Sequence, residues 1–377
     1  MTALSEPKLR FCTGNQMIAE GAVRAGCRFF AGYPITPASG IYKSMIDLLQ
    51  RRGDVAISAP DEISALAYCV GASMRGFKSM TATSGPGWAL MIETIQYALM
   101  TETPVVIAFV QRLGPSTGGA TQGAQGDILL SEFCTSGGYT IPILCPSTPA
   151  ECFDLTHKAF AWAEMLRTPV IVLSDKEVGM TSECVDFARL SNQAPPTRKH
   201  KSDFASSKMY DFAERDEVPE YLSVGGMGKV TATGSAHNKS GELKKNDTET
   251  LEVLHHLEEK IRSRRSELAV TTFDGQAGAE TLVVSFGITA RTMRETVRNI
   301  RRLGRKVSAL SIQSLFPVPE EKIKEAVLGI PRVVIAEENF SGQYRSVLAP
   351  LLYGKEVVGV NKIGSMITPA EIEEQIV

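Results

Sequence analysis

The residues best suited to chemistry in this sequence stand in four short segments, each after an apolar run. The first is 32–37, Gly-Tyr-Pro-Ile-Thr-Pro, where two prolines restrict the backbone and Thr36 offers a hydroxyl. The second holds two adjacent acids, Asp61 and Glu62. A carboxyl group can act as a general acid or base, but the helix dipole also stabilises acids at a helix start. Thr36 likewise has a second interpretation, as a helix cap within a turn.

The other two segments carry groups that suit anions. Residues 84–87, Ser-Gly-Pro-Gly, place Gly85 and Pro86 in a tight turn before an expected helix, whose first amides can bind an anion or the edge of a cofactor. A turn without a ligand explains these residues equally well. Arg112 follows a strongly apolar run. Its guanidinium can grip a carboxylate with two hydrogen bonds, or it can pair with an acid of the protein itself.

Apolar runs and helix-like segments alternate around these groups, which is typical of a mostly parallel sheet. We expect strands at 28–31, 54–58, 79–83, 104–110, 139–144 and 169–174, and helices at 14–25, 37–49, 61–74, 150–164 and from the turn at 84–87 to residue 100. Pro37 suits the first turn of its helix, because proline lacks the N–H that would be unpaired there. The four segments then follow strand ends, at the edge where doubly wound sheets bind ligands.

The second half of the sequence repeats this alternation after a polar stretch. Strands are expected at 281–286, 306–310, 332–336 and 356–360, and helices at 289–303, 320–327, after Gly342 and at 369–376. We therefore predict an α/β protein with a doubly wound domain at 1–190, a linker with a bridging helix at 191–279, and a smaller α/β domain at 280–377. The glycine-rich stretch 224–229 lacks the spacing of a phosphate-binding P-loop and is assigned to the linker.

Composition excludes several classes of protein. The chain has 377 residues, 43% of them hydrophobic and 22% charged, so disorder of the whole chain is excluded. A formal net charge of -2 gives no basic field that would attract nucleic acid or a membrane surface. Because no long apolar run occurs, we expect no membrane span, no secretory leader and a cytoplasmic protein. The seven cysteines and five histidines lack the spacing typical of a metal site.

Together these motifs resemble the α subunit of 2-oxoacid:ferredoxin oxidoreductases, the thiamine-diphosphate enzymes of the pyruvate and 2-oxoglutarate synthase type. The matching motifs are Gly-Tyr-Pro-Ile-Thr-Pro at 32–37, Asp-Glu at 61–62, Ser-Gly-Pro-Gly at 84–87, Arg112 with Gly-Pro-Ser-Thr-Gly at 114–118, and Gln-Gly-Asp at 125–127. The resemblance extends over nearly the whole chain. It implies a doubly wound, pyrimidine-type thiamine-diphosphate-binding domain followed by a smaller transketolase C-terminal-like domain.

The resemblance also implies roles for individual residues. Glu62 matches the glutamate that hydrogen-bonds the pyrimidine ring of thiamine and so promotes loss of the C2 proton. Thr36 and Arg112 match positions that contact the 2-oxoacid, and Gly85 and Pro86 join Glu62 as expected cofactor contacts. The implied reaction is a coenzyme A-linked oxidative decarboxylation of a 2-oxoacid, with 2-oxoglutarate as the first candidate, to an acyl-CoA and CO₂.

A missing motif implies a partner subunit. Enzymes of this type hold the diphosphate and its Mg²⁺ through a Gly-Asp-Gly motif, which does not occur here. The resemblance therefore implies a β subunit that carries the diphosphate site, the Mg²⁺ ion and a 4Fe–4S cluster, with no metal ligand in this chain. It further implies a dimer of αβ heterodimers, coenzyme A as co-substrate and ferredoxin as electron acceptor.

Two departures from the family pattern leave the identity of the 2-oxoacid open. Gly-Ala-Thr at 119–121 interrupts the usual continuation of the fourth motif, and Thr-Ser-Gly-Gly at 135–138 replaces a usual His-Gly-Asp.

Two other functions remain open for this chain. A thiamine enzyme that transfers ketol groups would use the same two domains, and a degenerate chain would serve as a scaffold, although retention of Thr36, Glu62 and Arg112 argues against a scaffold. A partner with cluster-binding cysteines would favour the oxidoreductase over the transferase.

Overall fold

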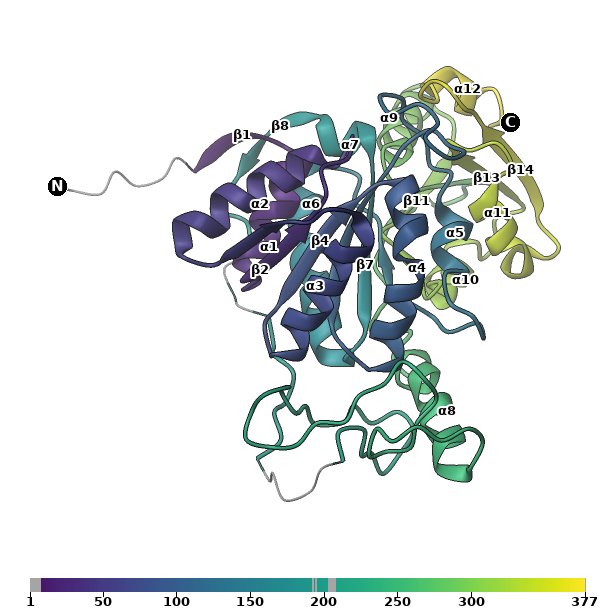
Figure 1. Ribbon diagram of the computed structural model, residues 1–377. Coiled ribbons are helices and arrows are strands. Elements are labelled where there is room, and N and C mark those ends of the chain that lie inside the picture. The colour runs from purple at the N-terminus through teal and green to yellow at the C-terminus, as the bar shows by residue number, and fades with distance from the viewer. Residues whose placement is uncertain (1–7, 192, 194, 203–207, 377) are drawn as a thin grey trace.

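A seven-stranded sheet organises the first half of the molecule (Figure 1). The computed structural model describes residues 8–191, 193, 195–202 and 208–376. The strands of this sheet are β2 (Phe29–Gly32), β3 (Val55–Ser58), β4 (Ser79–Thr83), β5 (Val105–Gln111), β6 (Ile143–Leu144), β7 (Pro169–Asp175) and β12 (Ser314–Phe316). They run in the order β12-β6-β7-β5-β4-β2-β3. Every neighbouring pair is parallel except β12 with β6, as expected for a doubly wound sheet.

Helices cover both faces of this sheet. One face packs against α1 (Gly14–Arg24), α2 (Ser39–Arg52) and α6 (Pro149–Leu166), and the other against α3 (Glu62–Met74) and α4 (Gly85–Met100). Because successive side chains of a strand point to opposite faces, β5 contributes to both cores. Its residues on the first face are Val106, Ala108 and Val110, and those on the second are Val105, Ile107 and Phe109. A strand buried on both sides reads as a continuous apolar run, which made β5 easy to predict.

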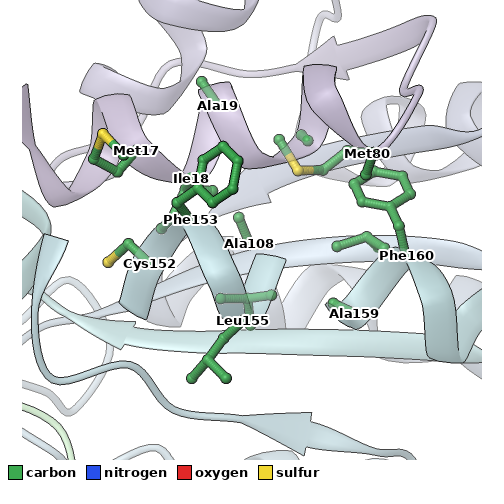
Figure 2. Packing of buried hydrophobic residues seen from close by; sticks show 14 of the residues in the cluster. Met17, Ile18, Ala19, Met80, Ala108, Cys152, Phe153, Leu155, Ala159 and Phe160 are labelled. Atoms are coloured by element: carbon green, nitrogen blue, oxygen red, sulfur yellow. The ribbon is translucent and has the colours of Figure 1, made fainter. Parts of the chain in front are cut away.

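Helices α1 and α6 pack against each other over the first core (Figure 2). Met17 and Ile18 of α1 and Phe153 of α6 are fully buried. A Cβ atom on Gly21 would lie 2.6 Å from the carbonyl oxygen of Phe153, so the two helices approach as closely as they do because residue 21 is glycine. This packing fixes α1 and α6 beside the sheet that carries the loops of interest.

A five-stranded sheet forms the second half. Its strands are β9 (Thr271–Asp274), β10 (Thr281–Ser285), β11 (Val307–Ile312), β13 (Arg332–Glu337) and β14 (Glu356–Asn361), in the order β14-β13-β10-β11-β9 with only β9 antiparallel. Helices α9 (Thr289–Arg302) and α12 (Pro369–Glu373) cover one face, and α10 (Glu320–Ala326), α11 (Gln343–Leu348) and the 3₁₀ turn Ala349–Leu352 cover the other. The second face shares one core with α3 and α4, which joins the two sheets.

Several short elements differ from the sequence prediction. β1 (Leu9–Thr13) and β8 (Ser182–Asp186) form an unpredicted antiparallel ribbon, and α5 (Ile128–Glu132) and α7 (Lys176–Met180) are unpredicted short helices. The strand expected at 139–144 is confined to β6. The helix expected from Pro37 begins at Ser39, after a cis Thr36–Pro37 bond, so Pro37 does not stand in its first turn. Among the described residues, no helix combines the length and apolar character needed to cross a membrane.

Helix α8 (Thr248–Arg262) lies below the first sheet in Figure 1 and is held there by a buried charge cluster. Lys260 Nζ lies 2.7 Å and His256 Nε2 lies 3.1 Å from Glu102 Oε2, and all three side chains are fully buried. Lys260 also donates to the carbonyl of Arg167. Burial opposes ionisation of Glu102, but Lys260, His256 and Arg167 hold its pKa well below the usual range. Glu102 and Arg167 precede β5 and β7, so α8 binds at the edge of the sheet opposite the carboxyl ends.

Candidate active site

The carboxyl edge of the first sheet brings the four segments together. After β2 the chain runs to β3 on one side, and α3 then carries it back to β4 on the other side of β2. The loops after β2 and β4 therefore flank the switch point of the sheet, which is where doubly wound proteins bind ligands. Thr36 lies in the first of these loops and Ser84 in the second.

Asp61 and Glu62 have different surroundings at the start of α3. Asp61 is the N-cap residue, and its Oδ1 accepts a hydrogen bond of 2.7 Å from the backbone N–H of Ser64, which accounts for this acid without a catalytic role. Glu62 is only 6% exposed, and no described residue hydrogen-bonds its carboxylate. Its Oε1 lies 2.5 Å from the point that a Cβ atom on Gly87 would occupy. The buried carboxylate of Glu62 thus faces the start of α4.

The start of α4 contains polar atoms without partners. Ser84 is the N-cap residue, but its hydroxyl makes no capping bond and is buried without a hydrogen-bond partner among the described residues. The amide nitrogen Nε2 of Gln111, at the end of β5, is also buried and unpaired. Buried polar groups are normally hydrogen-bonded. These unpaired atoms and the carboxylate of Glu62 favour a polar ligand at the start of α4 over a turn that binds no ligand.

Arg112 lies directly beside Thr36. Its Nη1 donates to the Thr36 carbonyl at 2.6 Å, and its Nη2 donates to the Thr117 carbonyl at 2.9 Å. Arg112 is 6% exposed, its Nε is buried and unpaired, and no carboxylate of the described residues forms an ion pair with it. The second interpretation of Arg112, as an internal ion-pair partner, is therefore excluded among the described residues. A buried cation without a counter-ion is costly, so the position suits an anionic ligand.

Thr36 does not cap a helix. Helix α2 begins at Ser39, and Ala38 is its N-cap residue. The side chain of Thr36 is exposed at the edge of the sheet. Its backbone carbonyl is what anchors Arg112, so the two residues that were expected to contact substrate are brought together.

A cavity of about 510 Å³ lies between the two halves of the molecule. From the first half it is lined by Gly85, Pro86, Arg112, Asp127 and residues 113–116, and from the second by Asn339, Phe340, Gln343 and Ile363. Three of the five expected site residues, Gly85, Pro86 and Arg112, therefore share one cavity. Thr36 and Glu62 do not form its wall, but they adjoin it through Arg112 and through the start of α4.

Sequence reasoning did not single out Asp127, except as part of the Gln-Gly-Asp motif. Burial raises the pKa of Asp127 to about 7, although the positive charge of Arg112 opposes this shift. The side chain lies in the cavity between the two halves, close to Gly85 of α4, and the tertiary fold sets this position. Spacing within the sequence could not show it.

Gln125 joins the two halves beside this cavity. Its Nε2 donates to Asp175 Oδ2 at 3.1 Å and to the Phe286 carbonyl at 3.2 Å. Its Oε1 accepts from Thr289 Oγ1 and from the Glu338 N–H, both at 3.0 Å. Gln125 is fully buried, and every hydrogen bond of its side chain crosses from the loop to another element. This residue therefore fixes the loop that carries Asp127.

Comparison with known proteins agrees with this geometry. Residues 20–256 match the family model described as pyruvate flavodoxin/ferredoxin oxidoreductase, thiamine diP-binding, and residues 279–372 match pyruvate:ferredoxin oxidoreductase core domain II. The 2-oxoglutarate synthase subunit KorA of Methanocaldococcus jannaschii is 37% identical, with 98% of this chain and 99% of the relative covered. Subunit alpha of 2-oxoacid:ferredoxin oxidoreductase 1 from Aeropyrum pernix is 30% identical over 89% of this chain, which spans 54% of that relative.

Solved structures show the same architecture. The 2-oxoglutarate:ferredoxin oxidoreductase from Magnetococcus marinus, with 2-oxoglutarate, coenzyme A and succinyl-CoA bound, superposes with a TM-score of 0.91 at 29% identity. The match covers 98% of this chain and 65% of that one. A split gene transketolase, an inactive beta4 tetramer, gives a TM-score of 0.56 at 14% identity, which shows a common fold alone. The resemblance inferred from the motifs and the predicted fold class are both confirmed.

Proposed function

Because this chain belongs to the pyruvate flavodoxin/ferredoxin oxidoreductase family, we propose that it is the α subunit of a thiamine-dependent 2-oxoacid:ferredoxin oxidoreductase. The complex converts a 2-oxoacid and coenzyme A to an acyl-CoA and CO₂ and transfers the electrons to ferredoxin. The first substrate to test is 2-oxoglutarate, which is named for the KorA relatives of 35–37% identity and is bound in the Magnetococcus enzyme.

The strongest support for this proposal is the environment of Arg112. It is a buried cation in the wall of a cavity, and no described carboxylate pairs with it. A 2-oxoacid supplies the missing negative charge. The Nη1 and Nη2 groups are already anchored by the carbonyls of Thr36 and Thr117, so the guanidinium is oriented before substrate binds. Arg112 and Thr36 are therefore assigned to substrate.

Glu62, Gly85 and Pro86 are assigned to thiamine diphosphate. The unpaired carboxylate of Glu62 and the unpaired hydroxyl of Ser84 at the start of α4 fit the polar edge of its pyrimidine ring. When bound, this cofactor supplies a carbon nucleophile and an electron sink. Glu62 holds a proton at the pyrimidine N1′, which makes the neighbouring amino group a better base. Gly85 and Pro86 shape the wall beside it, and Phe340 and Ile363 of the second half line the same cavity.

The rest of the site is assigned to a β subunit. Among the described residues, no group of His, Cys, Asp or Glu is placed to hold a metal ion, and the sequence has no Gly-Asp-Gly. We assign the diphosphate, Mg²⁺ and the 4Fe–4S cluster to that subunit, in a dimer of αβ heterodimers that reduces ferredoxin. The cytoplasm is the proposed compartment, because all seven cysteines are free thiols and six of them are buried.

The test is purification of the tagged chain together with the chain that copurifies with it. We expect that partner to contain iron, and the complex to form succinyl-CoA from 2-oxoglutarate and coenzyme A while reducing ferredoxin. Pyruvate and branched 2-oxoacids, supplied separately, identify the preferred substrate. An iron-free complex that transfers ketol groups between sugars would support the transferase instead. A complex with neither activity would support a scaffold and contradict the proposal.

A further inference from the structure

Asp127 is an acid in the cavity that the proposed reaction does not yet use. It lines the cavity together with Arg112 and Gly85, and its Oδ1 lies 3.4 Å from the point that a Cβ atom on Gly85 would occupy. Its Oδ2 is buried and has no hydrogen-bond partner among the described residues. Although Asp127 directly precedes α5, its side chain does not cap that helix. No described residue hydrogen-bonds Oδ1 either, so the side of the carboxyl group that lines the cavity is available to a ligand.

The surroundings of Asp127 favour a proton on this carboxyl group near neutral pH. Burial raises its pKa to about 7, and Arg112 is the charge that opposes the shift. The other titratable side chains on the surrounding elements are Glu62, Glu93, Tyr97, Glu132, Asp175, Glu177, Glu337, Glu338, Tyr344, Arg345 and Lys362, and none of them lines the cavity. The carboxylate of Glu62 faces the start of α4 at Gly87. Asp175 and Glu338 accept backbone N–H groups from Ile288 and Ile367, so their carboxylates are directed into the protein rather than into the cavity.

On the basis of the proposed function, we propose that Asp127 is a further substrate-contacting residue, whose protonated carboxyl group donates a hydrogen bond to a carboxylate of the 2-oxoacid attracted by Arg112. The ionised form would repel the same carboxylate, because both would be negative at close range. Binding of the 2-oxoacid therefore requires the proton on Asp127 to be present. No covalent bond forms or breaks in this step.

The experiment measures the KM for 2-oxoglutarate in the purified αβ complex from pH 6 to 9. Above the pKa of Asp127 the competent fraction falls, so the KM of the wild-type complex should rise about tenfold per pH unit above roughly pH 7. Asp127→Asn keeps a donor that does not titrate, so its KM should be flat over this range. Glu132→Gln is the matched control, since Glu132 is on α5 and burial also raises its pKa, but it does not line the cavity. Its KM should keep the wild-type slope.

The outcomes separate this proposal from the proposed function. A wild-type KM that does not change with pH, or an Asp127→Asn variant that keeps the wild-type slope, overturns the role of Asp127 while the activity stands. An Asp127→Asn variant with the wild-type slope would assign the titration to another group, such as Asp175 or Glu338, which this variant leaves unchanged. If the wild-type complex reduces no acceptor with any 2-oxoacid at any pH, the proposed function is contradicted. The role of Asp127 is then contradicted as well, because it rests on that function.

Discussion

At the residue scale, the adjacent acids Asp61 and Glu62 provide a matched pair for testing catalysis. Glu62→Gln keeps the shape of the side chain but removes the acid that holds the N1′ proton. We expect turnover of the complex to fall by on the order of 10²- to 10⁴-fold while the complex still assembles. Asp61→Ala removes only the cap of α3, which should cost about 1 kcal/mol of stability. Assay of acyl-CoA formation, with a melting curve for each variant, separates the two roles.

Near wild-type turnover in Glu62→Gln would show that the catalytic assignment is wrong. A large loss of turnover in Asp61→Ala, with little change in melting temperature, would assign the catalytic role to Asp61 instead of Glu62.

Arg112→Lys tests the substrate site. Lysine supplies the charge but cannot hold the carbonyls of Thr36 and Thr117 in the geometry of a guanidinium. We expect the KM for 2-oxoacid to rise more than the KM for coenzyme A, as steady-state kinetics with both substrates varied would show. An unchanged KM for 2-oxoacid together with a marked fall in melting temperature would limit Arg112 to a structural role.

At the scale of elements, Gln125 is one of the residues that connect the two halves beside the cavity. Gln125→Leu leaves the buried groups of Asp175, Thr289 and Glu338 without this partner, which should cost about 1 to 3 kcal/mol. The loop that carries Asp127 should loosen, and the KM for 2-oxoacid should rise. Gln96→Leu is the control, because the side chain of Gln96 bonds Ser136 and the Ile92 carbonyl, both within the first half. Equal kinetic effects of the two substitutions would exclude a specific coupling through Gln125.

The charge cluster under α8 makes a prediction about stability. Glu102→Gln leaves Lys260 buried without its counter-ion, which should cost roughly 3 to 5 kcal/mol. Glu320→Gln, which removes an exposed partner of Arg265, should cost about 1 kcal/mol or less. Because the folded-state pKa of Glu102 is depressed, its contribution is present at neutral pH and is lost as the pH falls below the ordinary value of 4.5. Denaturant unfolding at pH 7 and at lower pH should therefore show a difference between the variants that shrinks on acidification.

The main strands and helices could be predicted because each is long and periodic enough to be recognised locally. β5 and α4 are examples. The ribbon β1–β8 and the edge strands β9 and β12 could not be predicted. A short strand forms only when it pairs with another strand, and the strands that pair with these are distant in sequence. Among the site residues, Glu62 and Arg112 stood out by their place after strands. Gln125 did not, because its hydrogen bonds reach the second half, and Asp127 did not, because its place in the cavity depends on the tertiary fold.

At the scale of the whole molecule, we propose that this chain supplies one side of a site shared with a β subunit. The carboxyl edge of the first sheet carries the groups assigned to the pyrimidine and the 2-oxoacid, and in this proposal the β subunit supplies the groups that bind the diphosphate and Mg²⁺. Phe340, at the mouth of the cavity, is 86% exposed. A single chain therefore lacks the contacts from which most of the binding energy for the charged half of the cofactor would come.

The most direct test of this account is a calorimetric titration with thiamine diphosphate and Mg²⁺, performed on the purified chain alone and on the αβ complex. We expect Mg²⁺-dependent binding to the complex, and weak or undetectable binding to the single chain. Tight, Mg²⁺-dependent binding to the single chain would contradict the claim that the site is shared between two subunits.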